Sequence, residues 1–116
     1  MGRLTTHVLD TTRGTPARGV RIELQRAIGA GFETLAEVHT NQDGRCDRPL
    51  LEGDALAPGT YQLLFHIGAY FRAGGGADAS PFLDIVPVRF AVAAGAGHYH
   101  VPLVVTPWSY STYRGS

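Results

Sequence analysis

Short runs in which a large apolar residue recurs at every second position are the feature that most constrains the fold of this chain. The pattern holds over residues 20–25, 60–67 and 86–93. A period of two places successive side chains on opposite faces of a strand, whereas a helix would need a period near 3.6 residues. Turn-forming residues, such as those from Asn41 to Gly44, separate the runs. We therefore expect an all-β protein, a β-sandwich of about seven or eight short strands forming a single domain over residues 1–116.

The rest of the chain agrees with this reading. Further strands are expected at 4–10, 33–40, 98–106 and 108–116, the last of these as a short antiparallel return strand. A single helical turn is expected at 68–72. The Gly- and Ala-rich stretch 72–81 has no periodicity and is expected to form a mobile loop.

Composition removes several classes of function. The 116 residues carry a formal net charge of zero, so no electrostatic argument favours nucleic acid or an anionic membrane as a partner. The chain has no lysine, which excludes Schiff-base chemistry and a phosphate-loop lysine. Cys46 is the only cysteine, so no intramolecular disulfide can form. No apolar run is long enough to span a bilayer and no signal-peptide core is present, which predicts a cytoplasmic protein.

Histidines on expected strands are the first candidates for chemistry. His7 stands on the strand 4–10, where a lone histidine is most often structural. His98 and His100 share one face of the expected strand 98–106, at positions i and i+2. Such a pair could bind a metal or move protons near neutral pH, although no carboxylate pattern accompanies it. Arg45, just after a turn, is either an ordinary surface arginine or a fixed cation that stabilises a carbonyl or enolate oxygen.

The segment Tyr113-Arg114-Gly115-Ser116 is unusually rich in functional groups for the end of a chain. Terminal residues are normally poorly ordered, because few contacts offset the entropy lost when they are fixed. Here an apolar run and an aromatic cluster precede a phenol, a guanidinium and a flexible glycine. We expect the segment to be held in place and to contact something small and polar.

Three segments taken together resemble the 5-hydroxyisourate hydrolases, the transthyretin-related enzymes of urate breakdown. They are Leu4–Asp10, with sequence LTTHVLD, His98–Leu103, with sequence HYHVPL, and Tyr110–Ser116, with sequence YSTYRGS. The similarity spans essentially the whole chain in order. Within it, the terminal tetrapeptide distinguishes these enzymes from transthyretin, the thyroid-hormone carrier. Residues 81–85 depart from the segment usual in the family, which bears on the geometry of the preceding loop.

The resemblance implies a transthyretin-like sandwich of two four-stranded sheets with one short helix. It also implies a homotetramer, a dimer of dimers, with active sites in a channel between the dimers. The implied reaction is hydrolytic ring opening of 5-hydroxyisourate to 2-oxo-4-hydroxy-4-carboxy-5-ureidoimidazoline, with no metal and no organic cofactor. The residues to which it assigns catalysis are His7, Arg45, His98 and Ser116. Those to which it assigns substrate binding are His7, Arg45, Tyr113, Arg114, Gly115 and Ser116.

Two points stay open at this level. The role of His100 is not assigned, and neither is the identity of the general base among the histidines. A transthyretin-like carrier that binds a small aromatic ligand in the central channel is the alternative to an enzyme, and a plain interaction module is a third reading.

Overall fold

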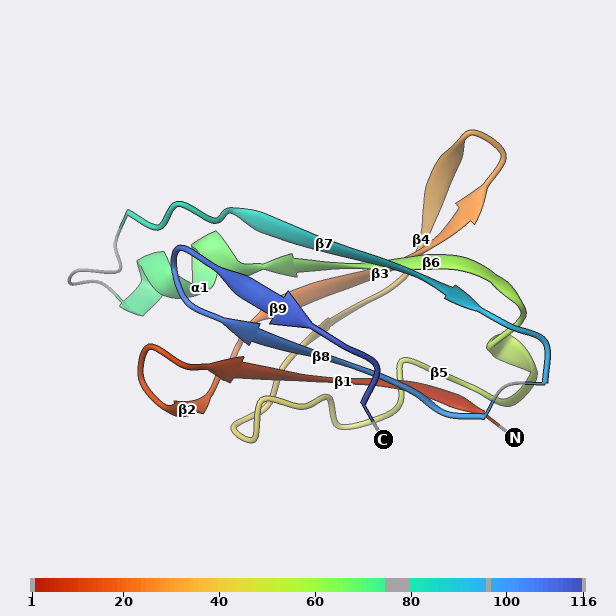
Figure 1. Ribbon diagram of the computed structural model, residues 1–116, viewed down its shortest axis with the longest axis horizontal. Coiled ribbons are helices and arrows are strands. Elements are labelled where there is room, and N and C mark those ends of the chain that lie inside the picture. The colour runs from red at the N-terminus through yellow and green to blue at the C-terminus, as the bar shows by residue number, and fades with distance from the viewer. Residues whose placement is uncertain (1, 75–79, 96, 116) are drawn as a thin grey trace.

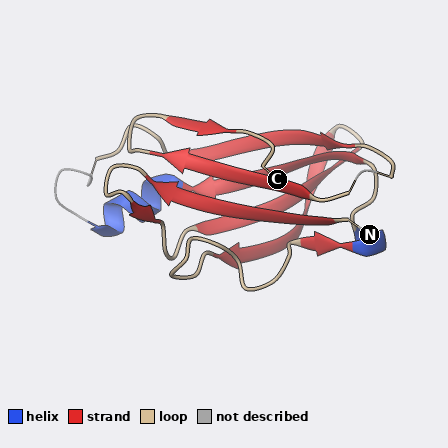
Figure 2. Ribbon diagram, turned by 60° about the horizontal axis from the view of Figure 1, so that its bottom comes forward, coloured by secondary structure: helices blue, strands red, loops and turns tan. Residues whose placement is uncertain are grey.

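Two β-sheets pack face to face and enclose the hydrophobic core (Figure 1). The computed structural model describes residues 2–74, 80–95 and 97–115. Figure 2 shows the strands in two layers, with the helix at one end of the sandwich. The two-sheet sandwich with one short helix, expected from the sequence, is confirmed.

The first sheet, called here the β1–β8 sheet, is built around a parallel pair of strands. Its members are β1 (Arg3–Asp10), β2 (Thr15–Pro16), β5 (Leu51–Glu52), β8 (Tyr99–Val105) and β9 (Tyr110–Thr112). It has five strands where four were expected, because the two-residue strand β5 pairs with the start of β1. The antiparallel return strand expected near the end of the chain is β9, which pairs with β8.

The second sheet is an antiparallel sheet of four strands in the order β4-β3-β6-β7. Its members are β3 (Arg21–Ile28), β4 (Gly31–His39), β6 (Gly59–His66) and β7 (Ile85–Val92). A short 3-10 turn, η1 (Gly53–Ala55), precedes β6, and the helix α1 (Ile67–Gly74) follows it. The helix is longer than the single turn expected, because Ile67 and Phe71 are one turn apart and both are buried in the core. Of the expected loop, residues 75–79 lie outside the described residues.

The alternating residues of the sequence line the space between the sheets, as their period of two requires. Tyr61, Leu63 and Phe65 of β6 are fully buried, and the Tyr61, Phe90 and Tyr99 rings stack across the core. On β1 the even-numbered residues face inward. Leu4 and Val8 are fully buried there, and Thr6 is 2% exposed. The odd-numbered residues of β1 therefore lie on the outer face of the β1–β8 sheet.

Hydrogen bonds of Asp10 connect the end of β1 to the turn that follows it and to α1. Its fully buried carboxylate accepts hydrogen bonds from the Arg13 guanidinium and the Tyr70 hydroxyl, both at 2.8 Å, and from the backbone N–H groups of Thr12 and Arg13. Burial alone would raise the pKa of this carboxyl group, but the hydrogen bonds outweigh burial and lower it. Burial and the bond to Asp10 raise the pKa of Tyr70 to about 12.

Candidate active site

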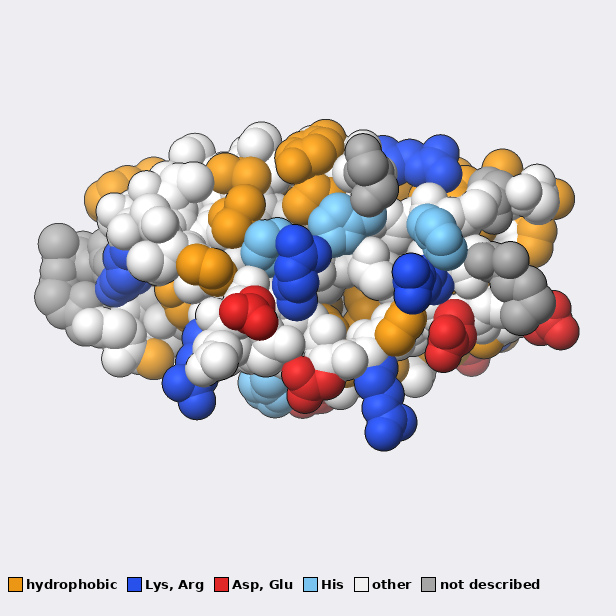
Figure 3. Space-filling view, turned by 90° about the horizontal axis from the view of Figure 1, so that it is seen from below, with side chains coloured by type: hydrophobic (Ala, Val, Ile, Leu, Met, Phe, Trp, Pro, Cys, Tyr) orange, Lys and Arg blue, Asp and Glu red, His pale blue; other side chains and the backbone are white. Residues whose placement is uncertain are grey.

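The pairing of strands brings His7, Arg45 and His100 together on the outer face of the β1–β8 sheet. Arg45 forms an isolated β-bridge with His7, which makes the two residues neighbours across one edge of β1. On the other side of β1, Thr5 is in register with His100 of β8, and His100 in turn bridges to Gly115. Figure 3 shows histidine and arginine side chains gathered along the middle of this face. We call His7, Arg45 and His100 the His–Arg cluster.

A tight turn fixes Arg45 beside His7. The Asn41 side-chain oxygen accepts hydrogen bonds from the backbone N–H groups of Asp43 and Arg45, at 2.9 and 3.2 Å. Gly44 has a φ of 74°, and a Cβ atom there would lie 2.5 Å from the carbonyl oxygen of Val8. Only glycine therefore lets the turn approach β1 closely enough for the Gly44 carbonyl to accept the 2.8 Å hydrogen bond from Val8. In the described part of the chain, no hydrogen bond or ion pair occupies the exposed Arg45 guanidinium.

His100 is held from two sides. Its Nδ1 shares a 2.8 Å hydrogen bond with the Thr5 hydroxyl, and its backbone oxygen accepts a 2.7 Å bond from the Gly115 N–H. Gly115 lies directly against the ring, since a Cβ atom at this position would be 2.6 Å from Cδ2 of His100. The imidazole position therefore depends on the first strand and on the terminal segment at the same time.

The environment favours the neutral form of both clustered histidines. Burial lowers the pKa of His7, and the Arg45 guanidinium lowers it further, against an opposing contribution from a hydrogen bond to the Asp43 backbone carbonyl and from the Asp43 charge. Burial lowers the pKa of His100 as well, with further contributions from Arg45 and His7. Each imidazole is therefore uncharged near neutral pH, so it can accept or donate a proton beside a fixed positive charge.

The terminal segment contributes its backbone to this site and turns part of its side chains elsewhere. The Thr112 hydroxyl donates to the Pro102 carbonyl at 2.8 Å. The Arg114 guanidinium lies 4.0 Å from the centroid of the Tyr99 ring and donates to the His98 carbonyl at 3.0 Å. Tyr113 is 59% exposed. Ser116 lies outside the described residues.

The structure does not bring His98 into the cluster, which differs from the expectation that the resemblance suggested. His98 precedes β8, and the register Leu4–Tyr99 continues to place it beside the start of β1, beyond Thr5. It is exposed and lines a shallow cavity with Gly2, Gly53 and Asp54. His98 and His100 share a face, as the sequence predicted, but only His100 is level with Thr5 and Gly115. Sequence spacing alone could not choose between them.

Two other candidate chemistries find little support. Burial and the neighbouring Asp47 raise the pKa of the Cys46 thiol, so it is protonated and a poor nucleophile at neutral pH. Among the described residues, no three His, Cys, Asp or Glu side chains converge in a way that could hold a metal ion. The part of the chain that is described also has no helix with the length and apolar character needed to cross a membrane.

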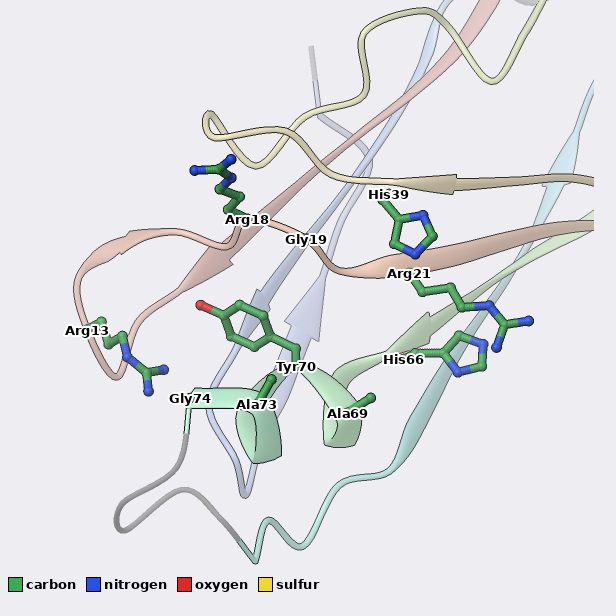
Figure 4. A pocket seen from close by; sticks show the side chains of 10 residues that line it. All are labelled: Arg13, Arg18, Gly19, Arg21, His39, His66, Ala69, Tyr70, Ala73 and Gly74. Atoms are coloured by element: carbon green, nitrogen blue, oxygen red, sulfur yellow. The ribbon is translucent and has the colours of Figure 1, made fainter.

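A cavity of about 710 Å³ lies near α1 and is lined by none of the three residues of the His–Arg cluster (Figure 4). His39 and His66 stand on either side of Arg21 at one end of it, and Arg13 and Tyr70 lie at the other. Two of the lining arginines already have acidic partners, since Arg13 pairs with Asp10 and Arg21 with Glu37 at 3.0 Å. Nε2 of His66 shares a 2.7 Å hydrogen bond with Glu23, and the Tyr70 hydroxyl donates to Asp10. Because most of the polar lining is engaged in this way, we do not place the active site there.

By contrast, the His–Arg cluster lies on an open sheet face. Five cavities in the described parts of the chain, the one near α1 included, are not lined by His7, Arg45 or His100. Small-molecule sites normally bury most of their ligand. The cluster therefore has the residues of a proton-transfer site but lacks an opposing wall among the described residues of one chain.

Comparison with known proteins is consistent with this geometry. The model of the HIUase/Transthyretin family matches residues 4–115. A curated 5-hydroxyisourate hydrolase from Deinococcus radiodurans is 58% identical over 113 residues, which cover 97% of this chain and 95% of the relative. The solved structure of 5-hydroxyisourate hydrolase from Klebsiella pneumoniae has a TM-score of 0.83 at 38% identity, with both chains fully covered.

Two further solved structures share the fold. Transthyretin from Sparus aurata has a TM-score of 0.88 at 27% identity, with 99% of this chain and 97% of that chain covered. A crystal structure of (S)-allantoin synthase has a TM-score of 0.89 at 45% identity and covers 99% of this chain, which spans 44% of the length of that protein.

Proposed function

The chain belongs to the HIUase/transthyretin family, and we propose from this membership and from the His–Arg cluster that it hydrolyses 5-hydroxyisourate in urate degradation. The observation that carries the proposal is the grouping of His7 and His100, two histidines with lowered pKa values, around the guanidinium of Arg45. Hydrolysis of an amide-like ring bond needs a base for water, a cation for the developing oxyanion and a proton for the departing nitrogen. The cluster contains groups suited to each need.

We assign the general base to His7. The Asp43 backbone carbonyl, which contributes to the pKa of His7, favours a hydrogen on the ring nitrogen that faces it, and the other ring nitrogen then carries a lone pair. This nitrogen takes a proton from water as the water oxygen bonds to the ring carbonyl carbon. The carbon–nitrogen bond of the ring then breaks, and the His7 imidazolium returns the proton to the departing nitrogen. The net change is the addition of one water molecule.

Arg45 and His100 act on the substrate oxygens. The free guanidinium of Arg45 can donate two parallel hydrogen bonds to the oxyanion that develops during attack. Residues Tyr113–Gly115 of the terminal segment form a wall for the flat heterocycle. Within that segment we assign to Arg114 the anchoring of the backbone, because its side chain is engaged by Tyr99 and the His98 carbonyl.

A homotetramer would supply the missing wall. β7 and β9 are the edge strands of the two sheets, and unpaired edges are ready to pair with another chain. Large apolar side chains are exposed at or next to these edges, namely Phe82, Ile85, Trp108, Tyr110 and Tyr113. Two-fold pairing of these edges and of the β1–β8 faces would give a dimer of dimers with sites between subunits. Light scattering should give a mass four times the 12.4 kDa of the chain.

The carrier alternative has the weaker support. The transthyretin fold is as close as that of the hydrolase, so overall shape does not separate the two functions. Identity to the hydrolases is higher, and a carrier for an aromatic ligand has no need of two histidines with lowered pKa values beside an arginine.

The decisive experiment compares three histidine variants in a hydrolysis assay. The transient ultraviolet signal of 5-hydroxyisourate, generated from urate by urate oxidase, should decay faster when the protein is added. His7→Asn should lower kcat by roughly 100-fold or more, the usual contribution of proton transfer. His100→Asn should also lower kcat by roughly 100-fold, the usual cost of removing a hydrogen-bond donor to a developing oxyanion. His98→Asn is the matched control and should behave like the parent protein. If the parent protein does not accelerate the decay, the proposed function is wrong. If His98→Asn is the variant that loses activity, the assignment to His100 is wrong.

The cytoplasmic location stays a prediction that cell fractionation would test.

A further inference from the structure

The side chain of Thr5 forms a hydrogen bond with one histidine of the His–Arg cluster. Its side chain lies on the outer face of β1, half-buried, between His7 on the same strand and His100 on the neighbouring strand. The Thr5 Oγ1 atom is 2.8 Å from Nδ1 of His100. The neighbouring Thr6 faces the core and donates instead to the Val101 carbonyl, at 2.7 Å. The two threonine side chains thus lie on opposite faces of β1, and of the two only Thr5 forms a hydrogen bond with an imidazole of the cluster.

The tautomer of His100 decides the direction of the Thr5–His100 bond. In the described residues, the only hydrogen bond of Thr5 Oγ1 is the one to His100. When the hydroxyl donates to Nδ1, this bond uses the hydroxyl hydrogen, and the neutral imidazole carries its own hydrogen on Nε2. Gly115 packs against Cδ2, the ring carbon bonded to Nε2, and so limits rotation of the ring away from this bond.

We propose that Thr5 is a positioning residue that holds His100 in the Nε2–H tautomer, so that His100 donates a hydrogen bond to the substrate while His7 accepts a proton from water. This inference rests on the proposed hydrolase function. The two histidines are then in complementary states. The Asp43 carbonyl favours a hydrogen on the His7 nitrogen that faces it, and Nδ1 of His100 accepts a hydrogen from the Thr5 hydroxyl. A neutral imidazole that donates from Nε2 is an established way to stabilise a developing oxyanion.

Two substitutions at Thr5 separate the hydrogen bond from packing. Thr5→Val keeps the shape of the side chain and removes the hydroxyl, and Thr5→Ser keeps the hydroxyl and removes a methyl group. Thr34→Val, on an exposed strand remote from the cluster, is the matched control for a Thr-to-Val change. Loss of one neutral hydrogen bond should lower kcat by about 3- to 10-fold in Thr5→Val, with a smaller change in KM. Thr5→Ser should restore most of the lost rate.

Nitrogen-15 NMR of labelled histidine gives a readout that does not depend on activity. The chain has five histidines, and the signals of His100 can be assigned as those absent from His100→Gln. In the parent protein and in Thr5→Ser, Nδ1 should resonate as a hydrogen-bonded nitrogen without a bound hydrogen, and Nε2 as a protonated one. In Thr5→Val the Nδ1 signal should move to the position of a nitrogen that has lost this bond or should reveal a mixture of tautomers.

The outcomes are distinct from those that test the hydrolase function. A protonated Nδ1 in the parent protein would overturn the inference even if hydrolysis is fast. Equal kcat and equal Nδ1 signals in the parent protein and Thr5→Val would overturn it as well. Absence of hydrolysis by the parent protein would instead refute the proposed function, whatever the tautomer of His100.

Discussion

The contact between Gly115 and His100 allows a single methyl group to test whether the terminal segment positions the His100 imidazole. Gly115 has no positive φ, so alanine can adopt its backbone conformation without strain. The added Cβ atom in Gly115→Ala, however, would lie 2.6 Å from Cδ2 of His100. Ordinary contact begins near 3.4 Å, so the ring or the tail must move by about 0.8 Å. The ring cannot yield freely, because its Nδ1 is tied to Thr5 at 2.8 Å.

A displacement of this size has a predictable effect on catalysis. Misplacing a reacting group by about 1 Å can cost 100-fold in rate, so we expect Gly115→Ala to lower kcat/KM by roughly 30- to 100-fold. This corresponds to about 2–2.7 kcal/mol of transition-state stabilisation. A fall in kcat would indicate that the ring has moved, and a rise in KM with unchanged kcat would indicate that the tail has moved instead.

The assay is the decay of 5-hydroxyisourate, followed at several substrate concentrations, with Gly97→Ala as the matched control. Gly97 also has no positive φ, and a Cβ atom there meets nothing within 4 Å, so this variant should match the parent protein. Thermal unfolding of both variants would check that the fold is retained. A Gly115→Ala protein with unchanged kcat and KM would refute the positioning of His100 by the terminal segment.

Three further predictions concern charge and burial. Activity should fall on the acid side, below the ordinary histidine pKa of 6.5, as His7 becomes protonated. Arg45→Gln should move this fall to higher pH, because burial then remains as the main cause of the lowered pKa, and a pH profile of kcat/KM that does not move would contradict the coupling. Tyr70→Phe should lower the free energy of unfolding by about 1.5–3 kcal/mol at neutral pH, measured in urea, because the Asp10 carboxylate loses a donor. The lowered pKa of Asp10 stabilises the fold above the unfolded value of 3.8, so this loss should shrink as the pH falls through the folded pKa, and a loss independent of pH would argue against it. Cys46→Ser should leave kcat unchanged, since burial raises the pKa of the thiol, and a large fall in kcat would reveal a nucleophile.

The sequence predicts the fold well because the information needed is local. The period of two over Leu4–Asp10 places His7 on the same face as Thr5 and opposite Val8, and Asn41 and Gly44 predict the turn before Arg45. Which second histidine joins His7 in the cluster cannot be predicted from the residues around either one. His98 and His100 have the same facing in sequence, and only the parallel register between β1 and β8 places His100 beside Thr5. Register between strands 95 residues apart depends on the packing of the whole sheet, so spacing within either strand could not supply it.

The position of the cluster on paired central strands explains how an open sheet face can support proton transfer. Thr5, His7 and His100 stand on β1 and β8, whose inner faces are anchored by fully buried Leu4, Val8 and Leu103. Groups on such strands are held more precisely than groups on loops. Arg45 comes from a loop, yet its turn is closed by Asn41 and by the close approach of Gly44 to Val8. Each chain can therefore fix the geometry of its own cluster, and the proposed tetramer needs to supply only the wall that covers the bound substrate. On this reasoning, a variant that dissociates the proposed tetramer should lose substrate affinity and rate while the His100 tautomer, read by NMR in the separated chain, stays that of the parent protein.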